Sequence, residues 1–215
     1  MSPRAPLPAP GRRGVLGCLL LGLLPAAPVR AGRQVEEALA DSVRTALSAA
    51  IHRAAPPQLA FDSPQSQAAY QRWHAAVGQR LLRRMPEAAL REAFLETLWY
   101  ESARAGLERA LVLGLIEVES GFRKYAISRA GARGLMQVMP FWVRLIGDGD
   151  PARLFHLQTN LRFGCVILRH YLDTERGNLF LALGRYNGSR GQAAYPNAVL
   201  AARRRWDLPA EVPAG

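Results

Sequence analysis

Apolar side chains recur along most of this chain at the three- and four-residue intervals of an α-helix, and strand-like alternation is nearly absent. Two stripes carry the pattern most clearly: the first contains Tyr70, Trp73, Val77 and Leu81, and the second contains Leu90, Phe94 and Leu98. Side chains at this spacing share one face of a helix, so each stripe predicts a helix with that face in the core. Ser63-Pro64 and Pro86 supply helix-start signals before the two stripes.

Further helices are predicted over residues 34–53, 107–118, 160–176, 178–184 and 195–206. The helix at 107–118 is apolar on nearly every side after Arg109, so we expect it to lie buried in the middle of the domain. The helix at 160–176 is amphipathic, with Leu161, Leu168 and Leu172 expected inside and Arg162, Arg169, Asp173 and Arg176 outside. The predicted fold class is therefore all-α.

The composition fits one globular domain with a sizeable core. The chain has 215 residues, of which 49% are hydrophobic and 21% are charged, and these values exclude a mainly disordered or collagen-like protein. Two cysteines, Cys18 and Cys165, cannot form a disulfide scaffold, and no spacing of metal-finger type is present. The longest apolar run is shorter than the roughly 20 residues of a membrane-spanning helix.

The first 31 residues predict a secretory signal peptide. Arg4, Arg12 and Arg13 form a positive start without an acid, and an apolar run follows over residues 14–24. Pro25 ends the run, and Val29-Arg30-Ala31 places small residues before an expected cleavage after Ala31. The pair Arg12-Arg13 resembles a twin-arginine signal only in part, so Sec export to the periplasm is the prediction and Tat export the alternative.

The net charge of +11 predicts an anionic partner such as nucleic acid, a lipid surface or an acidic polymer. The arginines are scattered along the chain, so a compositional habit is an equal alternative. A DNA-binding helical protein would fit the charge, but the export signal argues against nucleic acid as the partner.

A pair of carboxylates at the end of the helix at 107–118 is the first candidate for chemistry. Glu117 and Glu119 lie where the helix dipole and apolar surroundings both disfavour the ionised form, which raises a carboxyl pKa. A carboxyl group that stays protonated near neutral pH is a general acid. The two residues point about 200° apart, so at most one faces the core, and periodicity does not choose between them.

The sequence motifs around Glu119 resemble those of a known family. Glu119-Ser120-Gly121-Phe122 is followed by Ala126-Ile127-Ser128, by the stretch AGARGLMQVMP at 130–140, and by Arg185-Tyr186-Asn187-Gly188. In this order and spacing they resemble the SLT domain of soluble lytic murein transglycosylases, a lysozyme-like family that cuts bacterial cell-wall glycan. The resemblance implies a lysozyme-like helical domain over residues 101–206, with an N-terminal helical extension at 32–100 and a tail at 207–215.

The same resemblance implies the site residues. Glu119 is expected to be the single catalytic acid and base, and Tyr195 matches the tyrosine that hydrogen-bonds and orients it. The residues expected to bind the glycan are Ser128, Gly134, Leu135, Met136, Gln137, Tyr186 and Asn187. Plain core packing is the alternative for Met136, Met139 and Tyr186.

Two positions depart from the family pattern. Relatives place a Glu-Thr pair before the final tyrosine, where the glutamate touches the peptide stem, but this chain has Ser189-Arg190-Gly191-Gln192 there. Stem recognition of that kind is therefore not expected. Relatives often have alanine where this chain has Arg185, which predicts an added positive charge near the cleft.

The expected reaction follows from a count of carboxylates. Hydrolysis of a glycoside uses two carboxylates roughly 5 to 9.5 Å apart, and the nearest acids after Glu119 are Asp148 and Asp150, in a turn that reads as a solvated loop. A lytic transglycosylase needs one, because the sugar closes a 1,6-anhydro ring on itself. No metal and no cofactor is implied.

Alternative functions are a muramidase that uses water and a non-catalytic peptidoglycan-binding or secretion-associated module. The expected partner is the peptidoglycan glycan strand. The positive charge also predicts peripheral attraction to anionic lipid, and the sequence leaves a secretion machine open as a further partner.

Overall fold

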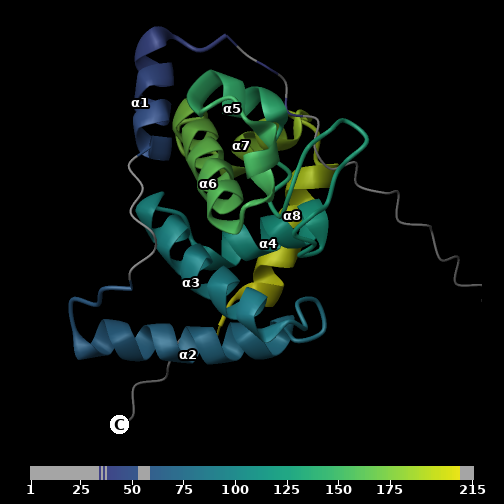
Figure 1. Ribbon diagram of the computed structural model, residues 1–215. Helices are drawn as coiled ribbons and strands as arrows, with labels where there is room; N and C mark the ends of the chain where they lie inside the picture. Colours follow the sequence, from purple (N-terminus) through teal and green to yellow (C-terminus); the bar gives the residue numbers. More distant parts are fainter. Residues whose placement is uncertain (1–33, 35, 37, 53–58, 209–215) are drawn as a thin grey trace, which may run out of the picture.

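The protein is built from α-helices, as the periodicity predicts (Figure 1). The computed structural model describes residues 34, 36, 38–52 and 59–208. Its helices are α1 (Asp41–His52), α2 (Pro64–Leu81), α3 (Ala88–Arg104), α4 (Arg109–Ser120), α5 (Pro140–Ile146), a 3-10 helix (Pro151–Phe155), α6 (Leu157–Thr174), α7 (Leu179–Asn187) and α8 (Ala194–Trp206). Extended pairing in this part of the chain is limited to two isolated bridges, Ile127 with Arg133 and Arg133 with Val138.

Helix α4 lies in the middle of the molecule, and α8 packs across it (Figure 1). Residues Val112 to Ile116 of α4 are almost completely inaccessible to water, as the apolar character of this segment predicts. The crossing is close because Gly114 has no side chain: a Cβ atom there would lie 2.5 Å from the backbone nitrogen of Arg203. The two helices therefore meet backbone to backbone at this point.

Helix α2 covers one end of the molecule, beneath α3 and α4, whereas α1 packs against α5 and α6 (Figure 1). Ser63 caps α2 in a reciprocal capping box with Ser66, and Pro64 takes the first helical turn. The predicted stripes are buried: Trp73, Val77 and Leu81 on α2, and Phe94 and Leu98 on α3. Among the described helices, none has both the length and the apolar character needed to cross a bilayer.

Several predicted helix bounds differ from the observed ones. The first helix begins at Asp41, the sixth runs from Leu157 to Thr174, and the seventh continues to Asn187. The short helix α5 and the 3-10 helix were not predicted, because a single turn or two carries too little periodicity. The predicted domain boundary at residue 100 falls inside α3, and the predicted signal peptide at 1–31 lies outside the described residues.

The prediction for Arg162 is wrong. Its side chain is only 6% exposed, because Glu101 of α3 accepts hydrogen bonds from its Nη2 at 2.7 Å and its Nε at 3.0 Å. Arg104 donates to the other oxygen of Glu101 at 3.2 Å. A buried charge is tolerated when it is paired and hydrogen-bonded. Arg162 is therefore buried, although the sequence pattern places it on the polar face of α6.

Candidate active site

The C-terminal end of α4 presents Glu119 toward the interior. The helix ends at Ser120, and Gly121 caps it in the left-handed conformation (φ 58°), with its N–H bonded to the carbonyl of Glu117. Phe122 also has a positive φ of 68°, which is uncommon for a residue with a side chain. Its ring is held between Phe94 and Trp206, at centroid distances of 5.9 and 5.2 Å.

Glu119 has the environment of a carboxylic acid that keeps its proton. It is 5% exposed, and the Tyr195 hydroxyl donates to its Oε1 at 2.5 Å. Burial raises the pKa of Glu119 to about 8, while the hydrogen bond from Tyr195 lowers it in part. The other oxygen, Oε2, is buried without a hydrogen-bond partner in the structure. Because Oε1 is occupied by Tyr195, the proton of the neutral acid belongs on Oε2.

Glu117, two residues earlier, faces another part of the molecule. Its carboxylate accepts from Arg84 at 3.1 Å, from Arg205 at 2.9 Å and from the Trp206 indole at 2.6 Å. Partial burial acts to raise the pKa of Glu117, but these hydrogen bonds lower it overall. Glu117 is thus an ionised structural residue, and of the two carboxylates left open by periodicity, Glu119 is the one suited to carry a proton at neutral pH.

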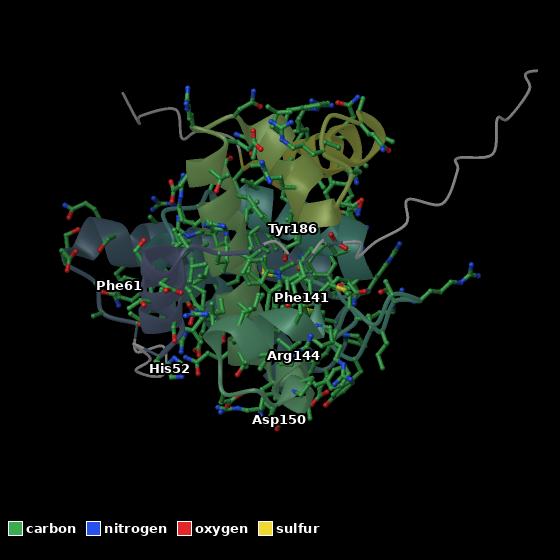
Figure 2. All side chains as sticks on the ribbon, turned by 90° about the horizontal axis from the view of Figure 1, so that it is seen from above. His52, Phe61, Phe141, Arg144, Asp150 and Tyr186 are labelled. Atoms are coloured by element: carbon green, nitrogen blue, oxygen red, sulfur yellow. The ribbon has the colours of Figure 1, made fainter. Side chains whose placement is uncertain are left out.

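Two buried tyrosines lie beside Glu119. Tyr195, in the first turn of α8, is 2% exposed, and Tyr186, near the end of α7, is fully buried. Burial, and next the charge of the Glu119 carboxylate, raise the pKa of each phenol. The Tyr186 hydroxyl donates to the Met136 carbonyl at 2.8 Å, and Figure 2 shows this residue in the interior of the molecule. Tyr186 therefore links the helical part of the site to the loop that follows α4.

That loop is fixed by Asn160 of α6, which the sequence analysis did not single out. Its Oδ1 accepts from the Met136 N–H at 2.8 Å, and its Nδ2 donates to the carbonyls of Arg133 at 2.9 Å and Leu154 at 2.8 Å. Gly134 makes room for it, since a Cβ at that position would lie 2.2 Å from the Asn160 amide nitrogen. The sequence signal that could have revealed this role is an asparagine at the first position of the amphipathic helix predicted at 160–176.

The remaining predicted glycan-binding residues have different surroundings. Leu135 and Met136 are buried in the core, as the packing alternative for Met136 holds, and the backbone of Gly164 leaves space for the Met136 sulfur. Gln137 has a positive φ of 49°, and its amide nitrogen donates to the carbonyls of Gly134 and Ala126. Ser128 is half-buried and accepts from the Ala132 N–H at 3.1 Å.

The chain shares its sequence pattern with a known family. The profile of the transglycosylase SLT domain matches residues 97–205, about half of the chain. The chain belongs to the transglycosylase SLT domain family.

Curated relatives include membrane-bound lytic murein transglycosylase C of Yersinia pestis (strain Pestoides F) and of Yersinia pseudotuberculosis (serotype O:1b, strain IP 31758). Each is 34% identical over 113 residues, covering 46% of this chain and 32% of the relative. The chain thus spans about a third of the length of these relatives. Among solved structures, an inactive mutant of the lytic transglycosylase Slt of Pseudomonas aeruginosa matches with a TM-score of 0.43 and 22% identity, over 65% of this chain and 27% of that one.

In this SLT domain, Arg185, which was predicted to add positive charge near the cleft, shares a carboxylate with a second arginine. Arg185 pairs with Glu175, and the same carboxylate binds Arg190 through its Nε at 2.7 Å and its Nη2 at 3.0 Å. The hydrogen bond from Arg190, followed by that from Arg185, lowers the pKa of Glu175 to about 2. Glu175 is thus the partner that holds Arg190, a residue of the stretch at 189–192 that departs from the family pattern. Next to it, Asn187 is 5% exposed and accepts from the Ser189 hydroxyl.

The two aspartates that follow Glu119 most closely in the chain, Asp148 and Asp150, have surroundings unlike those of Glu119. Asp148 and Asp150 are exposed, and Figure 2 shows Asp150 at the edge of the molecule. Asp148 pairs with Arg153, and Asp150 caps the 3-10 helix through the Ala152 N–H. Among the described residues, no cluster of three His, Cys, Asp or Glu could hold a metal ion. The interpretation of the Gly-Asp-Gly-Asp stretch as a solvated turn fits this arrangement.

Gln34 reaches the site from outside the helices, and the sequence analysis missed it. It is 5% exposed, and its Oε1 accepts from the Trp142 indole at 2.9 Å. Its side chain also interacts with the Tyr186 hydroxyl. A lone glutamine in a polar stretch carries no pattern that would reveal such a position.

Proposed function

We propose that the chain is a lytic transglycosylase that cleaves the β-1,4 bond between N-acetylmuramic acid and N-acetylglucosamine in peptidoglycan, with Glu119 as acid and base. The observation that carries the proposal is the buried Glu119, held by Tyr195 and with its pKa raised to about 8, while no second carboxylate among the described residues has such surroundings. The family and the names of the curated relatives support the same reaction.

In the first step, the proton on Oε2 of Glu119 passes to the glycosidic oxygen, and the bond from C1 of the muramic sugar to that oxygen breaks. Positive charge develops at C1, where the acetamido group of the same sugar can stabilise it. The Tyr195 hydroxyl donates to Oε1 throughout, so it stabilises the carboxylate that the proton leaves behind. Tyr195 is thereby assigned as the residue that orients the acid.

In the second step, the Glu119 carboxylate takes the proton of the C6 hydroxyl, and the C6 oxygen bonds to C1. This closes the 1,6-anhydro ring and returns Glu119 to its starting state, so no water is consumed. A nucleophile tethered to its target can have an effective molarity of ~10⁵–10⁸ M. The raised pKa helps here, because a carboxyl with a pKa of about 8 is a stronger base than an exposed glutamate.

For the other site residues, we propose contacts with the sugar by Ser128, Gln137 and Asn187. Gly134, Leu135, Met136 and Tyr186 are assigned to shaping the cleft, because their own side chains are small or buried. We also propose that the chain is exported to the periplasm by its first 31 residues through the Sec route, because peptidoglycan lies outside the cytoplasmic membrane.

The products of purified peptidoglycan distinguish this reaction from hydrolysis. We expect mass spectra dominated by 1,6-anhydro ends, which are lighter by one water than reducing ends, and no uptake of ¹⁸O from labelled water. Boiled enzyme is the control. Reducing ends carrying ¹⁸O would make the protein a muramidase and would require a second carboxylate for the attacking water.

Replacing Tyr195 by phenylalanine tests the assigned role of the hydroxyl. The bond from Tyr195 lowers the pKa of Glu119, so its loss raises that pKa further. Since cleavage needs the protonated acid, kcat/KM of the wild type should fall as the pH rises through about 8. In Tyr195→Phe the fall should move to higher pH, and kcat should drop about tenfold because the carboxylate loses a stabilising donor. An unmoved pH profile would contradict the assigned role.

A further inference from the structure

The loop between Glu119 and Gln137 carries a cluster of unpaired cations. Arg123, Lys124, Arg129 and Arg133 lie on it, and residues 120–147 contain no acid. Within the described part of the chain, none of the four forms an ion pair, whereas Arg84, Arg162, Arg190 and Arg205 each pair with a carboxylate. We call these four residues the basic rim.

Two apolar side chains stand out on the same loop. Tyr125 is 69% exposed and Ile127 is 64% exposed, which is unusual for large apolar residues. The Lys124 ammonium lies 5.0 Å from the centre of the Tyr125 ring, and the centre of the Phe155 ring lies 6.1 Å from it. A flat aromatic face beside a cation offers both apolar contact and charge to a ligand.

A groove runs alongside the basic rim. It has a volume of about 570 Å³, and one wall is the segment from Phe122 to Ile127, which joins Glu119 to Ser128. The other wall is formed by Met85, Pro86 and Leu90, from the turn before α3 and its first part. Arg123 and Lys124 face the groove, and Glu87 is the acid on its lining; Arg84, also on the lining, is already paired with Glu117.

We propose that this groove and the basic rim bind an acidic peptide, the carboxylate-bearing stem attached to the peptidoglycan glycan. The proposal rests on the proposed function and names a substrate feature that the site selects. One wall of the groove begins at Phe122, three residues after Glu119, and ends at Ile127, the residue before Ser128, so a peptide branching from a sugar that contacts Ser128 lies within its reach. Its unpaired cations match carboxylates, and its apolar walls match the side chains of a short peptide.

This assignment accounts for a departure noted in the sequence. The Glu-Thr pair through which relatives touch the stem is replaced here by residues 189–192, and Arg190 of that stretch is bound to Glu175. The chain thus has cations available on the opposite loop instead of an acid near the final tyrosine. A lipid surface would also attract the basic rim. A membrane is contacted by a flat or protruding protein face, however, and it would leave the groove between the two walls unfilled.

Binding is tested with Glu119→Gln, which isolates recognition from turnover. The probes are a glycan tetrasaccharide that carries tetrapeptide stems and the same tetrasaccharide with its stems removed. We expect tighter binding of the stem-bearing probe, by about tenfold at low salt, and a preference that declines as salt rises. Adding Arg123→Gln and Lys124→Gln should remove most of this preference and leave the affinity for the stem-free probe unchanged.

Arg204→Gln is the matched control, because Arg204 is an exposed arginine on α8 that does not line the groove. It should keep the full preference for stems. Equal affinity of the parent protein for both probes, no binding of either, or a preference that survives loss of Arg123 and Lys124 would overturn the proposal. A loss confined to vesicles of anionic lipid, with the stem preference intact, would assign the basic rim to a membrane instead. These measurements do not depend on whether the reaction yields anhydro or reducing ends, so the two proposals fail separately.

Discussion

Glu119→Gln should reduce glycan cleavage by about 10²–10⁴-fold, the usual contribution of a single general acid. Glutamine keeps the size and the hydrogen bond of the side chain to Tyr195 but has no proton of suitable acidity to give to the glycosidic oxygen. Because no other carboxylate lies in a comparable environment among the described residues, none can take over. Release of soluble fragments from purified peptidoglycan measures the effect.

Glu117→Gln is the control for this variant. Glu117 binds Arg84, Arg205 and Trp206 on another face of α4, so its replacement should lower stability while most of the activity remains. If Glu119→Gln digests peptidoglycan at nearly the wild-type rate, or if only Glu117→Gln is inactive while folded, the assignment of the acid is wrong.

The folding stability of Glu119→Gln supplies an independent readout. The pKa of Glu119 is about 8 in the folded protein and 4.5 for an unperturbed glutamate. From pH 4.5 upward the unfolded chain ionises this group, while the folded protein keeps it neutral until about pH 8. The free energy of unfolding of the wild type therefore falls as the pH rises from 4.5 to about 8. The variant should therefore match the wild type at pH 4 and melt at a higher temperature than the wild type at pH 9.

Glu101→Ala should destabilise the fold by about 3–5 kcal/mol, the usual cost of leaving a buried partner charge uncompensated. Glu101 is 1% exposed and is the carboxylate that neutralises Arg162 between α3 and α6. Removing it leaves the guanidinium buried beside apolar residues of the core. Urea denaturation followed by circular dichroism gives the free energy of unfolding.

Two comparisons make this result specific to the buried pair. Asp173→Ala removes the exposed partner of Arg169 on α6 and should cost under about 0.5 kcal/mol. Replacing both Glu101 and Arg162 by methionine should cost less than Glu101→Ala alone, because the buried charge of Arg162 is then removed together with its partner. A single variant as stable as Asp173→Ala would mean that water reaches Arg162.

The all-α fold and the buried position of Glu119 could be predicted because their signals are local. The stripes on α2 and α3 repeat at helical spacing, and the burial of α4 follows from its apolar composition. Glu119 at the end of a buried helix follows from the same pattern, although the choice over Glu117 came from the family motif. In the structure the two carboxylates differ in their hydrogen-bond donors. Glu119 accepts from one tyrosine, whereas Glu117 accepts from two arginines and an indole.

The parts that could not be predicted depend on contacts between distant segments. Arg162 lies on the polar side of its own helix, and only the packing of α3 brings Glu101 against it. Asn160 acts on a loop more than twenty residues earlier in the chain, and Glu175, just after α6, pairs with both Arg185 and Arg190, which come later in the chain. Periodicity describes which side of a helix is apolar, but it carries no information about which charge from elsewhere meets a given residue.

The contact at Gly114 sets the rigidity of the site. Glu119 and Tyr195 stand on two different helices, α4 and α8, and their bond of 2.5 Å depends on how those helices are held together. Where α4 and α8 meet backbone to backbone, no layer of side chains lies between them that could change rotamer or compress. Thermal motion and hydrostatic pressure should therefore change the spacing of the acid and its tyrosine little.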